Sequence, residues 1–158
     1  MYHIFEKKEK IKNIKEKKNR TRPNIQINEI YEYDLDTPPE QLDAYCQSAN
    51  FIFNLAGVNR PKNPADFMKG NFGFASILLD TLKKYNNKAT IMLSSSIQAT
   101  LSGRFGNSEY GCSKKAGEDL FFSYAAETGV KVAVYRFPNL MGHSRPKYNS
   151  AVSTFCWA

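Results

Sequence analysis

The chain has 158 residues, of which 42% are hydrophobic and 13% aromatic; this is enough for one folded domain with a core and excludes a disordered chain. It has no apolar run long enough to cross a membrane, no secretory signal and only three cysteines, Cys46, Cys112 and Cys156, without metal-ligand spacing, so we expect a cytoplasmic protein with reduced thiols and no metal site. The net charge of +7 would suit an anionic partner such as nucleic acid or a membrane surface. The uneven distribution of that charge along the chain argues against such a partner.

The basic charge is concentrated in residues 1–22, which hold 9 Lys/Arg and 3 Asp/Glu, whereas residues 23–158 hold 13 and 12. We therefore divide the chain into a basic tail, residues 1–22, and one domain, residues 23–158. The tail has few apolar positions to bury, so we expect it to be solvated and dispensable for the fold. An arm that binds RNA or phosphate is the alternative, but because the domain itself is nearly neutral, nucleic acid is not the expected partner.

Strand-like and helix-like patterns alternate along the domain. The strand patterns are residues 29–34, 51–57, 90–96 and 131–137; the helix patterns follow the first three and begin at a capping box (Thr37–Glu40), at Asn63 before Pro64, and at Asn107 or Ser108. Gly129 closes the last of these helices. Four strands joined by three helices predict an α/β fold with a doubly wound parallel sheet.

Polar residues or glycines follow each strand pattern. They are Asp34 after the first, Ala56–Asn59 after the second, Ser94–Ser96 at the tip of the third and Pro138–Asn139 after the fourth. Ligands of doubly wound sheets bind outside the carboxyl ends of the strands, so we expect a site at this edge. Asn71, within the apolar stripe of the second helix, is either a satisfied structural asparagine or part of that site.

Tyr110 and Lys114, in the stretch YGCSK, are four residues apart near the start of the third helix, so they share one helix face. A free phenol titrates at about pH 10, too high for proton transfer at neutral pH, and a neighbouring ammonium lowers that pKa. A serine hydroxyl at the tip of strand 90–96 could hydrogen-bond the same reacting oxygen. Together these residue types predict a proton-transfer site for the interconversion of a carbinol and a carbonyl.

The stretches NLAG (54–57), GNFGFASILLDTLKK (70–84), SSS (94–96), YGCSK (110–114) and RFPNLMG (136–142) occur in an order that resembles the extended short-chain dehydrogenase/reductase family, the NAD-dependent epimerases and dehydratases. The stretches FNLAGVNRP, LSSSIQAT and SKKAGEDLFF are similar to the reductase domain of capsular polysaccharide biosynthesis enzymes of the CapF type. The resemblance covers about residues 28–158 and implies a Rossmann-like, NAD(P)-binding fold. It also implies reduction, at C4, of a 4-keto-6-deoxy UDP-N-acetylhexosamine on the way to UDP-N-acetyl-L-fucosamine.

The resemblance implies roles for individual residues. Tyr110 would be the general acid, Lys114 would lower its pKa and hold the nicotinamide ribose, and Ser96, with Ser95 as the alternative, would polarise the carbonyl. The implied cofactor contacts are Asp34, Ala56, Gly57, Asn71, Ser94, Ser95 and Pro138, and the implied substrate contacts are Arg60, Asn139, Arg145 and Asn149. The two arginines could equally be surface salt-bridge residues.

The expected cofactor is written NAD(P), because Asp34 at a strand end favours NAD whereas the reductive role favours NADPH. The expected partner is a UDP-sugar, and the full-length enzyme could be a homodimer. No membrane partner is expected.

Two features depart from the family pattern. The family opens with a glycine-rich G-x-x-G-x-x-G turn that binds the pyrophosphate, and this chain has no glycine before Gly57. The chain also stops at Ala158, inside an expected helix, so we interpret it as a fragment without the glycine-rich turn and the C-terminal part. Two functions stay open, a sugar-nucleotide reductase and a catalytically inactive remnant of one, and we expect the chain alone not to turn over sugar nucleotide.

Overall fold

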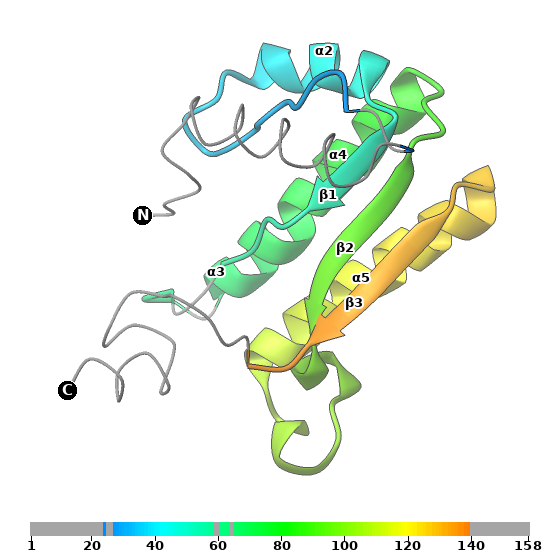
Figure 1. Cartoon of the computed structure of the whole chain (residues 1–158). Coiled ribbons are helices and arrows are strands. Elements are labelled where there is room, and N and C mark those ends of the chain that lie inside the picture. Colours follow the sequence, from blue (N-terminus) through cyan, green and yellow to red (C-terminus); the bar gives the residue numbers. More distant parts are fainter. Residues whose placement is uncertain (1–23, 25–26, 59–60, 64, 140–158) are drawn as a thin grey trace. The chain divides into compact units, whose positions relative to one another are not determined.

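The structure is a computed structural model that describes residue 24 and residues 27–58, 61–63 and 65–139 (Figure 1). The chain divides into two compact units, residues 1–41 and 42–158, and each unit is described by itself. The predicted basic tail, residues 1–22, lies outside the described residues. Within the described part of the chain, no helix is long and apolar enough to cross a membrane.

The described part of the first unit leads into a turn at Asp34. Thr37 N donates to Asp34 O (2.9 Å), and Asp34 N donates to Thr37 Oγ1 (3.0 Å). The strand expected at residues 29–34 is wrong, because this segment pairs with no strand of the described sheet. Residues that favour strands need a hydrogen-bonded neighbour and a surface to pack against before they form one. The helix expected after this turn is confirmed as α2 (Pro39–Ser48).

Three parallel strands form the sheet of the second unit, in the order β1-β2-β3. They are β1 (Phe51–Asn54), β2 (Thr90–Ser96) and β3 (Val132–Phe137). The register places Asn54 beside Leu93 and Ser96 beside Phe137. All three carboxyl ends therefore lie at one edge of the sheet, and the prediction of a parallel α/β sheet is confirmed.

The helical segments between the strands are more broken than the sequence patterns suggest. They are α3 (Ala65–Met68), the π-helical turn η1 (Lys69–Gly73), α4 (Phe74–Lys84), the 3₁₀ turns η2 (Ile97–Thr100) and η3 (Gly103–Phe105), and α5 (Glu109–Thr128). The predicted single helix after Asn63 is thus interrupted by a π-helical turn around Asn71. Such turns leave i→i−4 hydrogen bonds unmade and often occur at functional sites.

The ends of α5 follow the predicted capping signals. The Ser108 side chain accepts a hydrogen bond from Gly111 N (2.9 Å), which makes Ser108 the N-cap. Gly129 ends the helix with φ of 72°, a left-handed conformation that glycine adopts without a steric penalty. The cap at Ser108 places Tyr110 in the first turn of α5, immediately after the loop that leaves β2.

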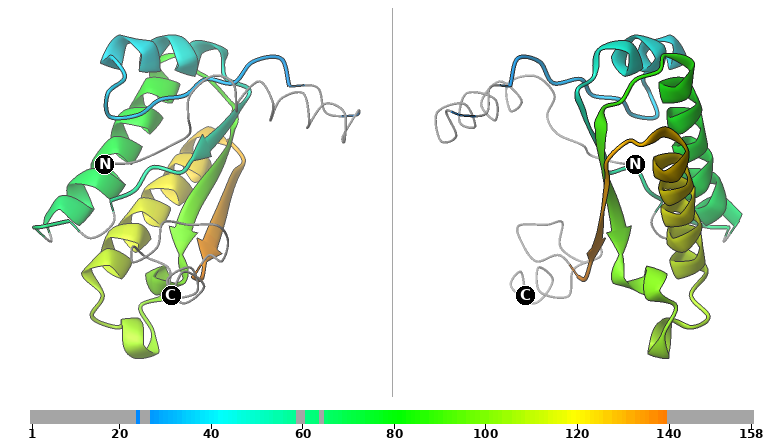
Figure 2. Two further views of the ribbon diagram at one scale, coloured as in Figure 1. Left: turned by 60° about the vertical axis from the view of Figure 1, so that its left-hand side comes forward. Right: turned by 90° about the vertical axis from the view of Figure 1, so that its right-hand side faces the viewer.

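Helices α4 and α5 lie on the same face of the sheet (Figure 2). Two successive right-handed crossovers that move in the same direction across a sheet place both helices on one side. The core fills the space between, with Leu82 of α4, Ile91 of β2 and Phe121 of α5 at most 1% exposed. The described residues thus show one helical layer of the predicted doubly wound arrangement.

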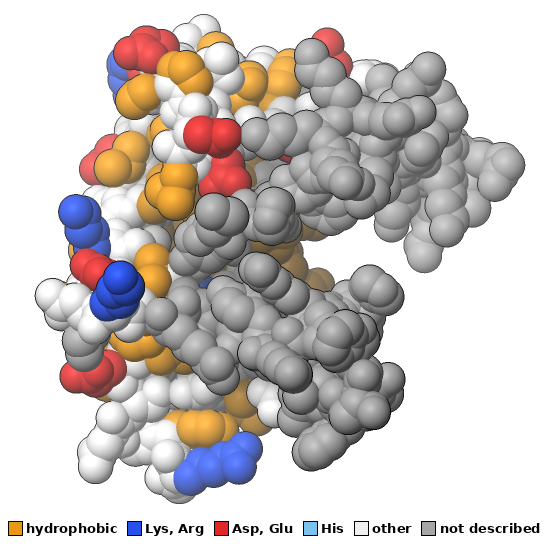
Figure 3. Space-filling view, turned by 90° about the vertical axis from the view of Figure 1, so that its left-hand side faces the viewer, with side chains coloured by type: hydrophobic (Ala, Val, Ile, Leu, Met, Phe, Trp, Pro, Cys, Tyr) orange, Lys and Arg blue, Asp and Glu red, His pale blue; other side chains and the backbone are white. Residues whose placement is uncertain are grey.

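Charged side chains do not gather by sign on the face shown in Figure 3, where the acidic and basic side chains of the described residues are interspersed. Sequence-independent binding of nucleic acid depends on a contiguous basic surface that neutralises phosphates. The described part of this face does not have one.

Candidate active site

The loop between β2 and α5 brings Ser96 and Tyr110 together. Ser96 ends β2, and its hydroxyl accepts a hydrogen bond from Gln98 N (3.2 Å). The Gln98 side chain in turn accepts from the hydroxyl of Ser108 (2.7 Å), the N-cap of α5. The loop is therefore closed by its own side chains, and the last residue of the strand faces the first turn of the helix.

The Ser96 side chain lies near enough to the Tyr110 hydroxyl to influence its pKa. The Tyr110 ring also meets the Phe67 ring edge-to-face, with 5.5 Å between centroids. Burial raises the pKa of the phenol, and Ser96 lowers it only in part. The expected lowering of this pKa by Lys114 stays a prediction. Tyr110 is protonated at neutral pH, which is the state that a general acid requires.

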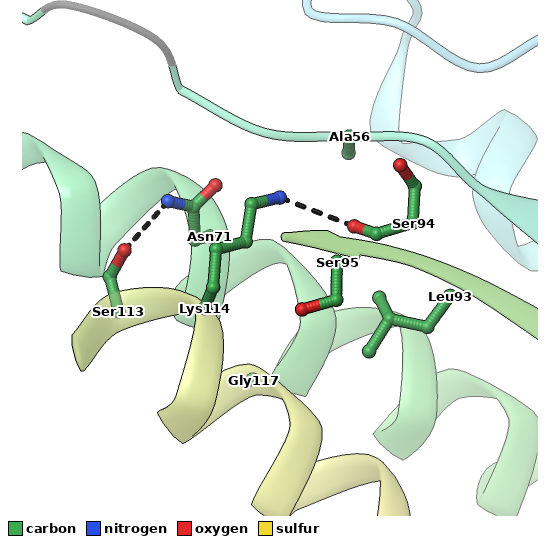
Figure 4. Close-up of a pocket in the computed structure, with 8 residues that line it drawn as sticks. All are labelled: Ala56, Asn71, Leu93, Ser94, Ser95, Ser113, Lys114 and Gly117. Carbon is green, nitrogen blue, oxygen red and sulfur yellow. Dashed lines mark hydrogen bonds between the residues drawn. The ribbon is translucent and has the colours of Figure 1, made fainter. Parts of the chain in front are cut away.

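Lys114 lies one helical turn after Tyr110, and its ammonium group is 5.8 Å from the centre of the Tyr110 ring. Its Nζ donates to the main-chain oxygen of Ser94 at 3.3 Å, as Figure 4 shows. Burial lowers the pKa of Lys114, and the negative charge of Glu118 opposes that shift. The lysine is thus held at the end of β2 by a single described hydrogen bond.

Gly57 closes the site from the end of β1. A Cβ atom on Gly57 would lie 2.9 Å from Lys114 Nζ and 3.0 Å from Asn71 Oδ1, closer than carbon atoms normally approach either group. A Cβ at this position would therefore require the ends of these two side chains to shift. Gly57 therefore lies beside Lys114 and Asn71, and its contact with the cofactor stays a prediction.

Asn71 connects the segment after β1 to α5. Its Oδ1 accepts from Val58 N (3.0 Å), and its Nδ2 donates to Ser113 Oγ (2.9 Å). Ser113 Oγ then donates to Tyr110 O (2.8 Å). Both ends of the buried amide are satisfied by the protein itself, so the arrangement supports the site from behind; a direct cofactor contact by Asn71 stays a prediction.

A cavity of about 10 Å³ lies behind Lys114 (Figure 4). It is lined by Ala56, Asn71, Leu93, Ser94, Ser95, Ser113, Lys114 and Gly117. This volume is roughly that of one water molecule, so a dinucleotide would have to lie outside it, along the edge of the sheet. On that side Gly57 leaves the space that a Cβ would fill, and Lys114 supplies a donor, so these residues fit the nicotinamide-ribose end of a cofactor.

The remaining predicted residues are placed less completely. Asp34 belongs to the first unit, where its side chain accepts from Leu35 N (2.8 Å). Pro138 and Asn139 directly follow β3 and are exposed. Three predicted substrate contacts, Arg60, Arg145 and Asn149, lie outside the described residues. Their roles stay predictions.

Two residues near the site were not identified from the sequence, Ser113 and Glu118. Both are 0% exposed, and both lie on α5 at helical spacing from the predicted pair, Ser113 three residues after Tyr110 and Glu118 four after Lys114. That spacing was the available signal, because residues three or four apart share a helix face. It could not show that the face is buried.

The family of this chain follows from its similarity to known proteins. The sequence pattern of the NAD dependent epimerase/dehydratase family matches residues 3–156. The chain belongs to this family. The match confirms the resemblance inferred from the motifs, and NAD(P) is the cofactor class of the family.

Two relatives lie closer in sequence. The chain is 36% identical over 129 residues to a UDP-2-acetamido-2,6-beta-L-arabino-hexul-4-ose reductase of Pseudomonas aeruginosa, an alignment that covers 81% of this chain and 33% of that protein. It is 39% identical to the crystal structure of the capsular polysaccharide assembling protein CapF of Staphylococcus aureus, with a TM-score of 0.67 over 90% of this chain and 37% of that one. The chain is therefore similar to CapF. It spans about a third of the length of these two relatives.

A third similarity concerns the fold alone. The structure of RMD from Pseudomonas aeruginosa, complexed with NADPH, matches with a TM-score of 0.58 at 22% identity, over 73% of this chain and 44% of that one. At this identity the match shows that the described sheet and helices have the arrangement of a Rossmann-like domain.

Proposed function

We propose that the chain forms part of an enzyme that uses NAD(P)H to reduce the 4-keto group of a 4-keto-6-deoxy UDP-N-acetylhexosamine in capsular polysaccharide biosynthesis. The observation that carries the proposal is the position of Lys114, whose Nζ donates to Ser94 O at the end of β2 (3.3 Å) and lies 5.8 Å from the centre of the Tyr110 ring. The similarity to a UDP-hexulose reductase and to CapF supports the choice of substrate class.

Proton delivery to the ketone oxygen is assigned to Tyr110. A bound NAD(P)H supplies the hydride to the carbonyl carbon. The Tyr110 hydroxyl gives its proton to the oxygen as negative charge develops there, and the Ser96 hydroxyl donates a second hydrogen bond to the same atom. The Lys114 ammonium stabilises the phenolate that remains on Tyr110, because an opposite charge nearby favours the ionised form.

The protonation state of Tyr110 suits this order of steps. Burial keeps the Tyr110 phenol protonated by raising its pKa, so a proton is available before the ketone is reduced. Ser96 is near enough to the phenol to influence its pKa, and a carbonyl oxygen placed between the two hydroxyls would accept from both. The substrate contacts proposed with this mechanism are Asn139, Arg60, Arg145 and Asn149; a cytoplasmic location and a homodimer are proposed with it.

The test is ketone reduction by the protein that contains this chain, followed through the loss of NAD(P)H absorbance with the UDP-4-keto sugar. Tyr110→Phe should abolish turnover, because the proton donor is removed while the ring contact with Phe67 remains. Ser96→Ala should lower kcat roughly 10²-fold or more, as expected for the loss of one oriented donor. Tyr85→Phe, at the C-cap of α4, is the matched control and should retain activity. Near-normal turnover by Tyr110→Phe would refute the assignment.

A second candidate function is a catalytically inactive remnant of such an enzyme. The observation that favours it lies inside the family match, where residues 3–56 hold no glycine, since a glycine-rich turn is the usual backbone site for the pyrophosphate. Titration of NADPH and NADH fluorescence with the protein separates the two candidates. A remnant gives no saturable change, whereas a dissociation constant in the micromolar range requires a phosphate site and supports the enzyme.

A further inference from the structure

Glu118 is a fully buried carboxylate on α5, one turn after Lys114, with 0% exposure. Ser95 Oγ donates to its Oε1 (2.6 Å). Arg136 of β3 donates through Nε to Oε1 (2.9 Å) and through its terminal nitrogen to Oε2 (2.6 Å). A buried charge is costly unless it is paired and hydrogen-bonded, and this carboxylate has three charge-assisted or hydroxyl donors. Their number makes Glu118 the best-connected side chain near the site.

The contacts of Glu118 interleave with those of the proposed catalytic residues. Three consecutive residues at the end of β2 each contact a different turn of α5. Ser94 O accepts from Lys114, Ser95 donates to Glu118, and Ser96 is near enough to Tyr110 to influence its pKa. The Ser95–Glu118 hydrogen bond lies between the other two contacts along β2. It therefore limits both sliding of the strand end along α5 and twisting of the strand end relative to α5.

Glu118 also joins the neighbouring strand to the same point. Ser95 and Arg136 are directly paired in the register of β2 and β3, and both donate to one carboxylate. A helix, the central strand and the outer strand are thus held at a single group below the site. Displacement of β2 by about 1 Å would stretch these bonds beyond the usual hydrogen-bond distance of about 3.2 Å, and a misplacement of that size can cost roughly 10²-fold in rate.

We propose that Glu118 is a positioning residue, which locks the end of β2 to α5 so that Ser96 stays within reach of Tyr110 and the Ser94 carbonyl stays beside Lys114. Its catalytic consequence rests on the function proposed above. A buried ion pair can often be replaced by apolar residues without loss of stability, so stability alone does not account for a charged group at this position.

The charge of Glu118 gives a signal that a purely structural role would not. It raises the pKa of Lys114 against the effect of burial. The other charged groups around Glu118 are Arg136 and Lys115, with Asp119 acting on Arg136. Because Asp119 pairs with Lys115 at the exposed surface, its neutralisation should not be felt at Lys114 in the same way.

The experiment compares Glu118→Gln with Asp119→Asn in two measurements. NMR titration of ¹³C-labelled lysine side chains should show the Lys114 pKa lower in Glu118→Gln and unchanged in Asp119→Asn. In the ketone-reduction assay Glu118→Gln should lower kcat about 10-fold or more, with the KM for NAD(P)H changed less than about twofold. A Lys114 titration and a kcat that both match the wild type would overturn the proposal.

A second variant covers the case in which Glu118→Gln does not fold because Arg136 is left without a carboxylate. The double variant Glu118→Gln/Arg136→Gln replaces the ion pair by two amides that can hydrogen-bond each other. It should fold and show the same two effects; a folded double variant with wild-type kcat and Lys114 pKa contradicts the proposal. If the wild-type protein reduces no keto sugar, the proposed function fails, while the Lys114 titration still tests Glu118.

Discussion

The approach of α5 to the β2–α5 loop can be tested by adding one methyl group at Gly111. A Cβ on this residue would lie 2.5 Å from the main-chain oxygen of Gln98 and 3.1 Å from Leu101 Cδ2. Cβ atoms in proteins essentially never come within 3.0 Å of another heavy atom, so the helix and the loop would have to separate by at least about 0.5 Å. Gly111→Ala therefore pushes the first turn of α5, with Tyr110, away from the strand end.

The size of the effect follows from a comparison with Gly73→Ala. Gly73 has helical backbone angles, φ −61° and ψ −48°, and a Cβ there would meet nothing within 4 Å. Alanine at such a position should stabilise the fold by about 0.5–1 kcal/mol through the lower entropy of the unfolded chain. At Gly111 the same gain is opposed by overpacking that costs about 1–3 kcal/mol. We expect net destabilisation of about 1–2 kcal/mol.

Urea unfolding followed by far-UV circular dichroism measures both variants. With a denaturant dependence of about 1–3 kcal/mol/M, the unfolding midpoint of Gly111→Ala should fall by roughly 0.3–2 M, and that of Gly73→Ala should rise or stay level. Because both changes add the same methyl group to helical backbone, their difference isolates the contact with Gln98. Equal midpoints for the two variants would refute the close packing of α5 on this loop.

Three further outcomes test other parts of the structure. Burial raises the pKa of the Cys46 thiol to about 11, whereas Cys112 is exposed, so iodoacetamide at neutral pH should modify Cys112 at least about tenfold faster in native protein; peptide mass spectrometry measures this, and equal rates contradict the burial. Asn87→Ala removes three hydrogen bonds to main-chain groups near the end of α2 and the start of β2. It should lower the free energy of unfolding by about 2–3 kcal/mol. The control Asn50→Ala, at an exposed position, should lower it by less than about 0.5 kcal/mol. Burial raises the pKa of Glu118, but its hydrogen bonds with Arg136 and Ser95 outweigh that effect and lower the pKa. The contribution of the Glu118 carboxylate to stability is therefore present above its ordinary pKa and lost as the pH falls through the folded-state value. The stability difference between wild type and Glu118→Gln should shrink in acid, and a difference that grows there would be evidence against these hydrogen bonds.

The sequence was sufficient to predict structural features that depend only on residues close to one another along the chain. An N-cap at Asn107 or Ser108, the closing Gly129 and the shared helix face of Tyr110 and Lys114 all follow from local spacing and backbone preference, and the structure has Ser108 as the cap. The position of the site at the carboxyl ends of the strands followed equally well, because a parallel sheet places those ends together. The family motifs occupy the same local segments, so they could be read without coordinates.

Tertiary structure alone decided what depends on residues far apart in the sequence. The β-forming segment at 29–34 forms no described strand, because pairing needs a partner that propensity cannot supply. The direction of the Tyr110 pKa shift was also decided by packing, since burial of the phenol outweighs the opposing effect of Ser96. The burial of Glu118 and its hydrogen bonds with Ser95 and Arg136, which lie on two different strands, likewise depend on the tertiary structure.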